Sequence, residues 1–259
     1  MSNNNQKRDK MYQQERMDKI MKILNKNHYV TVDYLVNEIK YSPASIRRDL
    51  TLLEKQGLVS RSYGGVAIKD PNNSPFRFRQ HNMKIAKNAI AKKAATLVKN
   101  GDVVFLDGSS TTQYIGHFLV DKKGITVITS NMILANFLSE NGITTYCTGG
   151  KVIEYPGILG GRFMMESLSE FNIDIAFFAS TALGEDGKIL SVSEQDILNH
   201  KAYRDNSKKL AYLCGNDKFN AKGKFSYLTL GDIDYFVSND TPSAEIMEKY
   251  KSTIYISTK

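Results

Sequence analysis

The sequence predicts a two-domain α/β chain, with a small helical domain at the N-terminus and a larger domain built on a mainly parallel sheet. Residues 14–69 contain short helical segments that end in a glycine-containing hairpin. Residues 80–259 alternate apolar strand-like runs with helical patterns, as expected when helices cover both faces of a parallel sheet. Residues 70–79 begin with DPNNSP, a polar, turn-rich stretch typical of a linker, and residues 1–13 form a polar, basic tail.

Charge is spread unevenly along the 259 residues, which carry a formal net charge of +8. Residues 1–70 have 13 Lys and Arg against 8 Asp and Glu (+5), and the rest of the chain has 22 against 19 (+3). This asymmetry suggests a polyanionic partner for the N-terminal part, although on charge alone solubility is the better explanation. Because the chain shows neither a signal peptide nor an apolar run of about 20 residues, we expect a cytoplasmic protein without a membrane partner.

The cysteines and histidines predict no metal site, cofactor or disulfide. Cys147 and Cys214 lie in apolar strand-like runs, so we expect both thiols to be small buried hydrophobic groups. The four histidines are scattered without the spacing of a metal site.

Three helical segments and a hairpin account for residues 14–68. Met17, Ile20 and Leu24 recur at helical spacing, and Thr31 is placed to cap a second short helix. Residues 42–57 predict the third helix, in which Ser42 is the cap, proline takes the first helical position and Gly57 ends the helix. Helices followed by a hairpin, in this order and within about 55 residues, predict a winged helix-turn-helix, whose last helix enters the DNA major groove.

A helical wheel of the third helix separates a core face from a DNA face. With Ile46 inward at 100° per residue, Leu50 and Leu53 share the core face, and Asp49 lies near it, where it is expected to orient Arg47 or a cap. The alternatives are an ordinary solvated face or a domain that contacts only proteins. The residues predicted to contact DNA, including those of the hairpin or wing, are Ser42, Ala44, Ser45, Arg47, Arg48, Thr51, Lys55, Arg61, Tyr63, Gly64 and Gly65.

This region resembles the DeoR family of bacterial transcriptional regulators. The matching segments begin at Arg16 and continue through residues 42–50 (SPASIRRDL), Gly57 and residues 61–66 (RSYGGV). The family pattern usually has threonine at position 45, histidine at position 63 and alanine at position 66. Ser45 retains the hydroxyl group, whereas Tyr63 predicts different wing contacts.

In the larger domain, a loop rich in glycine, serine and threonine follows the apolar run at residues 103–106 and precedes a predicted helix at residues 111–119. Backbone N–H groups, hydroxyl groups and a helix dipole there would favour a phosphate, whereas the alternative is an ordinary capped turn. The loop lacks the Lys-Ser/Thr ending of a nucleotide loop, so we expect neither ATP nor GTP. The predicted phosphate-binding residues are Asp107, Gly108, Ser109, Ser110, Thr111 and Thr112.

Further candidates lie at predicted strand ends and in one helix, where open α/β sheets bind ligands. For each lysine alone, a solvated role is also open, and the asparagine is equally suited to cap a helix. These effector candidates are Asn131, Gly149, Gly150, Lys151, Glu194, Lys201, Asp217 and Lys218, and Asp196 shares the helix of Glu194.

The resemblance to the DeoR family extends over this domain. The family's sensor domain is similar to ribose-5-phosphate isomerase and responds to phosphorylated sugars or related metabolites. The chain departs from the pattern where Ser130 and Asn131 stand in the reverse of the usual order and where Asp217 is shifted by two residues. The matching positions are Asp107, Gly108, Ser110, Thr111, Thr112, Gly149, Gly150, Gly160, Asp174, Phe177, Lys218 and Phe219.

The alternative function is a sugar-phosphate isomerase with a DNA-binding appendage. Isomerisation needs a positioned general base, and the isomerase has a cluster of carboxylates after its central strand. The corresponding stretch, residues 174–182 (DIAFFASTA), has aromatic and small residues in place of the acids, which predicts binding without turnover. We therefore expect a repressor of carbohydrate genes that binds double-stranded operator DNA and a phosphorylated sugar, as a homodimer or homotetramer.

Overall fold

A computed structural model describes residues 2–27, 29–62, 65–68, 76–81, 83–154 and 157–258. The chain divides into two compact units, Met1–Asn82 and Met83–Lys259. The helix α4 (Phe76–His81) begins inside the segment predicted as a linker. No helix within the described ranges is both long and apolar enough to cross a bilayer.

The N-terminal unit consists of three helices and a small antiparallel sheet in the order β1-β3-β2. Ile20 of α1, Leu35 of α2 and Ile46, Leu50 and Leu53 of α3 are buried in one core. This confirms the predicted helix faces, and the sheet adds a strand, β1, that the sequence analysis did not predict. The elements are α1 (Ser2–Asn27), β1 (Tyr29–Thr31), α2 (Val32–Ile39), α3 (Pro43–Lys55), β2 (Val59–Ser62) and β3 (Gly65–Ile68).

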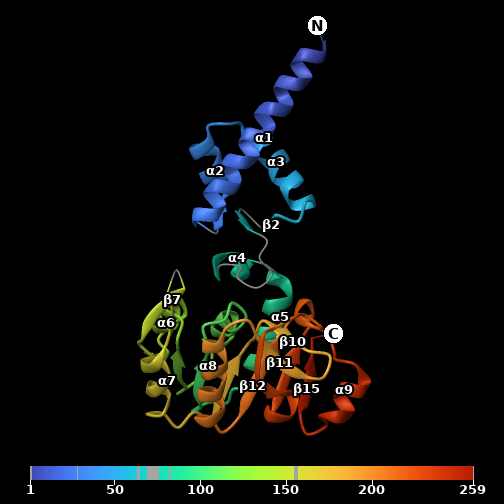
Figure 1. Cartoon of the computed structure of the whole chain (residues 1–259). Helices are drawn as coiled ribbons and strands as arrows, with labels where there is room; N and C mark the ends of the chain where they lie inside the picture. Colours follow the sequence, from blue (N-terminus) through green and yellow to red (C-terminus); the bar gives the residue numbers. More distant parts are fainter. Residues whose placement is uncertain are drawn as a thin grey trace. The chain divides into compact units, whose positions relative to one another are not determined.

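The second unit is built on a seven-stranded parallel sheet in the order β15-β14-β12-β9-β4-β5-β6 (Figure 1). The predicted α/β architecture is confirmed. The inner strands are apolar because layers cover both of their faces, whereas the edge strands β6 and β15 are partly exposed. The strands are β4 (Val103–Leu106), β5 (Thr126–Thr129), β6 (Thr144–Cys147), β9 (Ile175–Phe178), β12 (Leu210–Cys214), β14 (Tyr235–Ser238) and β15 (Ile254–Ser257).

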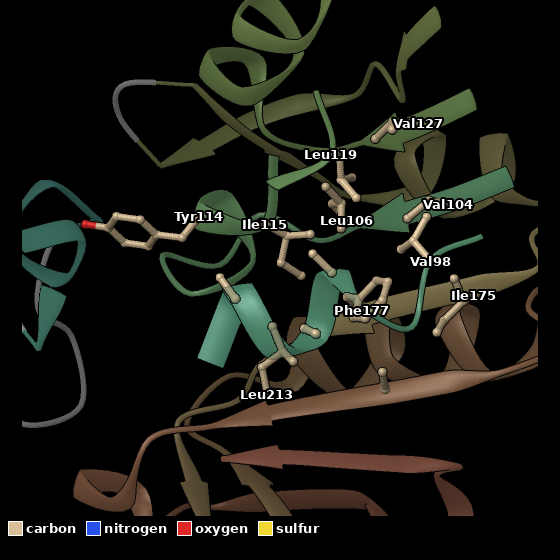
Figure 2. Close-up of a cluster of buried hydrophobic side chains, with 14 of the residues drawn as sticks. Val98, Val104, Leu106, Tyr114, Ile115, Leu119, Val127, Ile175, Phe177 and Leu213 are labelled. Carbon is tan, nitrogen blue, oxygen red and sulfur yellow. The ribbon is translucent and has the colours of Figure 1, made fainter. Parts of the chain in front are cut away.

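Helices pack on both faces of this sheet. One face carries α5 (Lys84–Ala95), the 3₁₀ helix η1 (Thr112–Phe118) and α6 (Met132–Glu140). Figure 2 shows this cluster, in which Val104, Leu106 and Phe177 of the sheet meet Ile115 of η1. A side chain as large as Phe177, which is fully buried, contributes about 1.5–3 kcal/mol to folding. The opposite face carries α7 (Arg162–Leu168), α8 (Glu194–Asp205) and α9 (Ala244–Lys249).

Two small antiparallel sheets and two short helices complete the unit. The hairpin β7–β8 follows β6, and its second strand bridges to Asn131. The sheet β10-β11-β13 contains the strand around Tyr227, which therefore lies outside the parallel sheet. The elements are β7 (Lys151–Glu154), β8 (Ile158–Gly160), β10 (Ala182–Leu183), β11 (Lys188–Ser191), η2 (Asn216–Lys218), β13 (Phe225–Thr229) and η3 (Leu230–Asp232).

The prediction that both thiols are buried is wrong for one of them. Cys214 is buried on the central strand β12, as expected, whereas Cys147 is exposed. The reason is topological, because β6 is an edge strand of the sheet and its neighbours cover it only in part. An apolar run of four residues does not reveal whether its strand is central or at an edge.

Candidate nucleic-acid interface and ligand site

The start of α3 is fixed by local chemistry. The Ser42 Oγ accepts a hydrogen bond from the Ser45 N–H at 3.2 Å, and Pro43 takes the first helical position. Gly57, just beyond the helix, has φ of +73°, a conformation that glycine adopts without strain. Both predicted ends of this helix are therefore confirmed.

The outer face of α3 is cationic, and its two arginine side chains have no protein partner among the described residues. Arg47, Arg48 and Lys55 are exposed, and near the helix start Ala44 is exposed as well. No hydrogen bond or ion pair joins the side chains of Arg47 or Arg48 to any residue that the structure describes. These two guanidinium groups are therefore available to guanine edges or phosphates.

Asp49 is fully buried on the opposite side of α3. Its carboxylate accepts hydrogen bonds from Arg16 Nε at 2.6 Å, Arg16 Nη2 at 3.0 Å and Gln13 Nε2 at 3.1 Å. The core-side position is as expected, but the expected partner was wrong, because Asp49 holds Arg16 of α1 and not Arg47. Asp49 and Tyr41 each help to raise the pKa of Arg16 above its usual value, the Asp49 hydrogen bond having the largest effect.

The wing strand β2 is tied back to the recognition helix. Arg61 Nη1 donates to Thr51 Oγ1 at 2.8 Å, and the Arg61 N–H donates to Glu54 at 3.1 Å. Gly65 lies against the ring of Tyr29, where a Cβ would collide with it. The predicted wing residues Tyr63 and Gly64 lie outside the described residues.

In the second unit, the strand order places the Ser/Thr loop at the point where the sheet changes direction. From β4 the chain proceeds through β5 to β6 on one side, and β9 and the following strands lie on the other side. Open α/β sheets bind ligands at the carboxyl ends of the strands at such a switch point. Asp107 follows β4 there, and Ala179 follows β9.

Asp107 links these two strand ends. Its Oδ1 accepts hydrogen bonds from the Ser109 N–H at 2.9 Å and from the Thr112 hydroxyl at 2.6 Å, and its Oδ2 accepts one from the Ala179 N–H at 3.1 Å. Burial raises the pKa of the Asp107 carboxyl, and these donors oppose the rise. Both carboxylate oxygens are used within the protein, so Asp107 shapes the loop.

The loop leaves several backbone donors unused. Among the hydrogen bonds of the described residues, none involves the N–H groups of Gly108, Ser110 or Thr111. Unused N–H groups in a short loop are donors of the kind that bind anions. Gly108 must lack a side chain, because a Cβ there would collide with Ile158 of β8.

A cation that the sequence analysis missed reaches this loop. Lys87 of α5 is 8% exposed, and its Nζ donates to Ser110 Oγ at 2.9 Å. A signal was present, because Lys87 precedes Ile90, Ala91 and Ala94 on the apolar face of the helix, where a lysine is unusual. The expected helix dipole is a weaker source of positive potential, since the segment after the loop is the seven-residue 3₁₀ helix η1.

The other predicted effector residues are divided between the strand ends and the surface. Asn131 caps α6 by accepting from the N–H groups of Ile133 and Leu134, and its Nδ2 is 3.5 Å from Gln113 Oε1. The remaining candidates are exposed or half-buried. Gly149, Gly150 and Lys151 follow β6, Asp217 and Lys218 follow β12 as an ion pair at 3.4 Å, and Glu194 and Lys201 are exposed on α8.

A buried histidine lies next to the same strand end. His200 of α8 packs against Phe178 with ring centroids 4.9 Å apart, and it is hydrogen bonded to the backbone of Ala179. Its Nδ1 has no partner, and burial lowers the pKa of the imidazole to about 4. Within the described ranges, no group of three His, Cys, Asp or Glu residues is arranged to hold a metal ion.

Two family models match the chain. A model of the DeoR-like helix-turn-helix domain matches residues 16–72, and a model of the DeoR C terminal sensor domain matches residues 83–240. The two matches correspond to the two units of the structure.

Similar proteins include named transcriptional regulators of nearly the same length. The chain is 25% identical to the glycerol-3-phosphate regulon repressor of Escherichia coli (92% of this chain, 95% of the relative). It is 29% identical to the transcriptional repressor GlcR of Bacillus subtilis (90% and 91%) and 30% identical to the regulator GolR of Listeria innocua (93% and 96%). Among solved structures, it is similar to ribose 5-phosphate isomerase from Plasmodium falciparum (15% identity, 53% of each chain, TM-score 0.39).

Proposed function

The chain belongs to the DeoR family of helix-turn-helix transcriptional regulators, and on this premise we propose that it is a repressor whose sensor unit binds a small phosphorylated metabolite. Its DNA-binding unit presents Arg47 and Arg48 on the exposed face of α3. Arginine at such positions can contact guanine edges or phosphates, and we propose double-stranded operator DNA as the partner.

We infer the chemical class of the ligand from one observation: the ammonium group of the buried Lys87 contacts a loop that has three unused N–H groups. A buried ammonium group beside a loop of unused donors supplies positive charge where a phosphate would bind, as lysine does in other phosphate sites. The three N–H groups and the Ser110 and Thr111 hydroxyls supply donors for the phosphate oxygens. Relatives named for a glycerol-3-phosphate regulon support a phosphorylated sugar or a related metabolite.

The same site favours binding over turnover. Asp107 is the carboxylate at the switch point, and its oxygens already accept hydrogen bonds from Ser109, Thr112 and Ala179. A general base needs an oxygen that is free to take a proton from the substrate. We therefore propose that the chain has no isomerase activity, and measurable aldose–ketose interconversion by the purified protein would overturn this part.

The test of the whole proposal is a DNA-release experiment. Genomic fragments selected by the full chain are titrated by fluorescence anisotropy at several salt concentrations, with glycerol 3-phosphate and glucose 6-phosphate set against glycerol and glucose. We expect a steep salt dependence and a 5- to 150-fold change in DNA affinity (about 1–3 kcal/mol of coupling) with a phosphorylated compound only. An equal response to the unphosphorylated compounds would refute the phosphate site.

A further inference from the structure

We propose that Thr51 and Arg61 act as one unit in DNA binding. The Thr51 hydroxyl holds the Arg61 guanidinium on the outer face of α3, where Arg61 binds a phosphate of the duplex. Thr51 is thus a positioning residue, which acts through Arg61 and donates no hydrogen bond to DNA. The inference rests on the proposed DNA-binding function and adds a division of roles, in which α3 reads bases and this pair fixes the DNA backbone.

The hydrogen bonds of Thr51 have a defined direction. Its Oγ1 donates to the Arg47 carbonyl oxygen at 2.9 Å, one turn earlier in α3, so the hydroxyl proton is used inside the protein. The same oxygen accepts a hydrogen bond from Arg61 Nη1 at 2.8 Å. Because its proton is directed at a carbonyl, Thr51 has no donor left for a phosphate or a base, and it serves as the acceptor that orients Arg61.

The half-buried Arg61 side chain is held without being neutralised. Thr51 takes one of the guanidinium N–H donors, and among the described residues no carboxylate forms an ion pair with Arg61. Glu54 accepts only the backbone N–H of Arg61, at 3.1 Å. The other guanidinium donors and the positive charge are therefore available to an anion.

Other cations surround Thr51. Residues three or four positions apart are neighbours on a helix surface. At this spacing α3 places three exposed cations and one exposed acid around Thr51, and Arg61 adds a fourth positive charge from β2. Four positive charges and one negative charge leave a net charge of +3, which attracts a polyanion. The exposed neighbours are Arg47, Arg48, Lys55 and Glu54.

The two ends of Arg61 are both fixed relative to α3. Its backbone is tied to Glu54 and pairs with Val66 of β3, and its side chain is tied to Thr51. An arginine that is already held loses less conformational freedom when it binds a phosphate than one that is not.

Arg47 and Arg48 differ from Arg61 in this respect, because no side-chain hydrogen bond or ion pair restrains them within the described part of the chain. Unrestrained side chains can adapt to different base edges, whereas a fixed guanidinium suits a phosphate, which every base pair presents.

The test measures the operator affinity of the full chain by fluorescence anisotropy at several salt concentrations. Arg61→Gln should weaken binding about tenfold and reduce the slope of log affinity against log salt by about 0.9, the value for one phosphate contact. Thr51→Val keeps the shape and removes the hydroxyl, so it should weaken binding about three- to tenfold, and Thr51→Ser should bind like the wild type. Wild-type affinity in Thr51→Val overturns the proposal.

The double variant Thr51→Val/Arg61→Gln separates positioning from an independent contact. It should bind no more weakly than Arg61→Gln alone, since Thr51 acts through Arg61, and additive losses overturn the proposal. The matched control is Lys22→Gln, which removes one positive charge from an exposed position of α1 in the same unit. It should leave the salt slope unchanged, and an equal reduction in this control would show that Arg61 acts only through net charge.

A second measurement maps the phosphate contact. Operator duplexes carry one uncharged methylphosphonate at a time, and each is titrated with the wild type and with Arg61→Gln. One phosphate should matter to the wild type and lose its effect in Arg61→Gln, whereas base substitutions should cost both proteins the same. Identical phosphate profiles overturn the proposal. If Arg61→Gln does not fold, Arg61→Lys takes its place and should weaken the effect of the same phosphate.

The proposed function and this inference fail in different ways. A full chain that binds no duplex with a steep salt dependence refutes both of them. Operator binding that is present in the wild type and unchanged in Thr51→Val refutes only the pairing of Thr51 with Arg61, and the proposed repressor stands.

Discussion

Replacing Lys87 with methionine tests the ligand site with little disturbance of the fold. Methionine has a similar length, and it removes the ammonium group that donates to Ser110 at 2.9 Å. Because Lys87 is 8% exposed, the folded wild type buries a charge, and methionine removes this cost. That gain in stability offsets the loss of the hydrogen bond. We expect the free energy of unfolding without ligand to change by no more than about 1 kcal/mol.

The expected loss of ligand affinity is much larger. An ammonium and a phosphate about 4 Å apart attract by about 4 kcal/mol at an effective dielectric constant of about 20. Desolvation and the existing hydrogen bond from Lys87 to Ser110 reduce this attraction. We therefore expect the substitution to remove about 2–3 kcal/mol of binding free energy. Such a loss corresponds to binding that is about 30- to 150-fold weaker.

Thermal unfolding with and without glycerol 3-phosphate or glucose 6-phosphate measures this loss. At a ligand concentration of about 100 times the dissociation constant, the wild type gains about 2.7 kcal/mol, and a variant that binds about 100-fold more weakly gains about 0.4 kcal/mol. The matched control is Lys93→Met, which removes an exposed lysine from the same helix and should keep the full gain. An equal gain in Lys87→Met and the wild type would refute the role of Lys87.

Three further predictions concern the DNA face, the loop and the buried histidine. Arg48→Ala should weaken operator binding by about 1–3 kcal/mol and leave the thermal response to ligand intact, and unchanged anisotropy would contradict the groove assignment. Thr112→Ala should lower the free energy of unfolding by about 1–3 kcal/mol, because the buried Asp107 carboxylate loses a donor. Thr111→Ala should weaken ligand binding with little effect on stability. Equal denaturation midpoints for the two variants would contradict this difference. His200 has a folded pKa of about 4, below its unfolded value of about 6.5, so its contribution to stability is full above pH 6.5 and falls by up to about 3 kcal/mol as pH drops to 4. Urea unfolding at several pH values should show this loss in the wild type and in a variant of the exposed His117, but not in His200→Gln; the same pH dependence in all three would show that His200 does not titrate in this way.

Local chemistry made much of the N-terminal unit predictable. The Ser42–Pro43 start, the stop at Gly57 and the inward spacing of Ile46 and Leu50 each depend on a few neighbouring residues, so they can be recognised in the sequence. The partner of Asp49 could not be predicted in this way, because Arg16 is 33 residues away and meets it only after α1 packs on α3.

Part of the ligand site could likewise be predicted from the sequence, and part could not. The loop at residues 107–112 follows an apolar strand and carries its own chemistry, whereas Lys87 reaches it from a helix that precedes the strand. Whether a strand lies at an edge is likewise a property of the assembled sheet. Cys147 was therefore expected in the interior, and the structure places it on the outer strand.

The paired contact between Arg16 and Asp49 has a consequence for how the protein can evolve. A guanidinium group that binds a carboxylate through two nitrogens fixes direction as well as distance, so α3 cannot roll about its own axis without losing both bonds. The side chains on the outer half of that helix can then be exchanged while the angle at which they are presented stays the same. New operator preferences can therefore arise from single surface substitutions, without repacking of the unit that carries them.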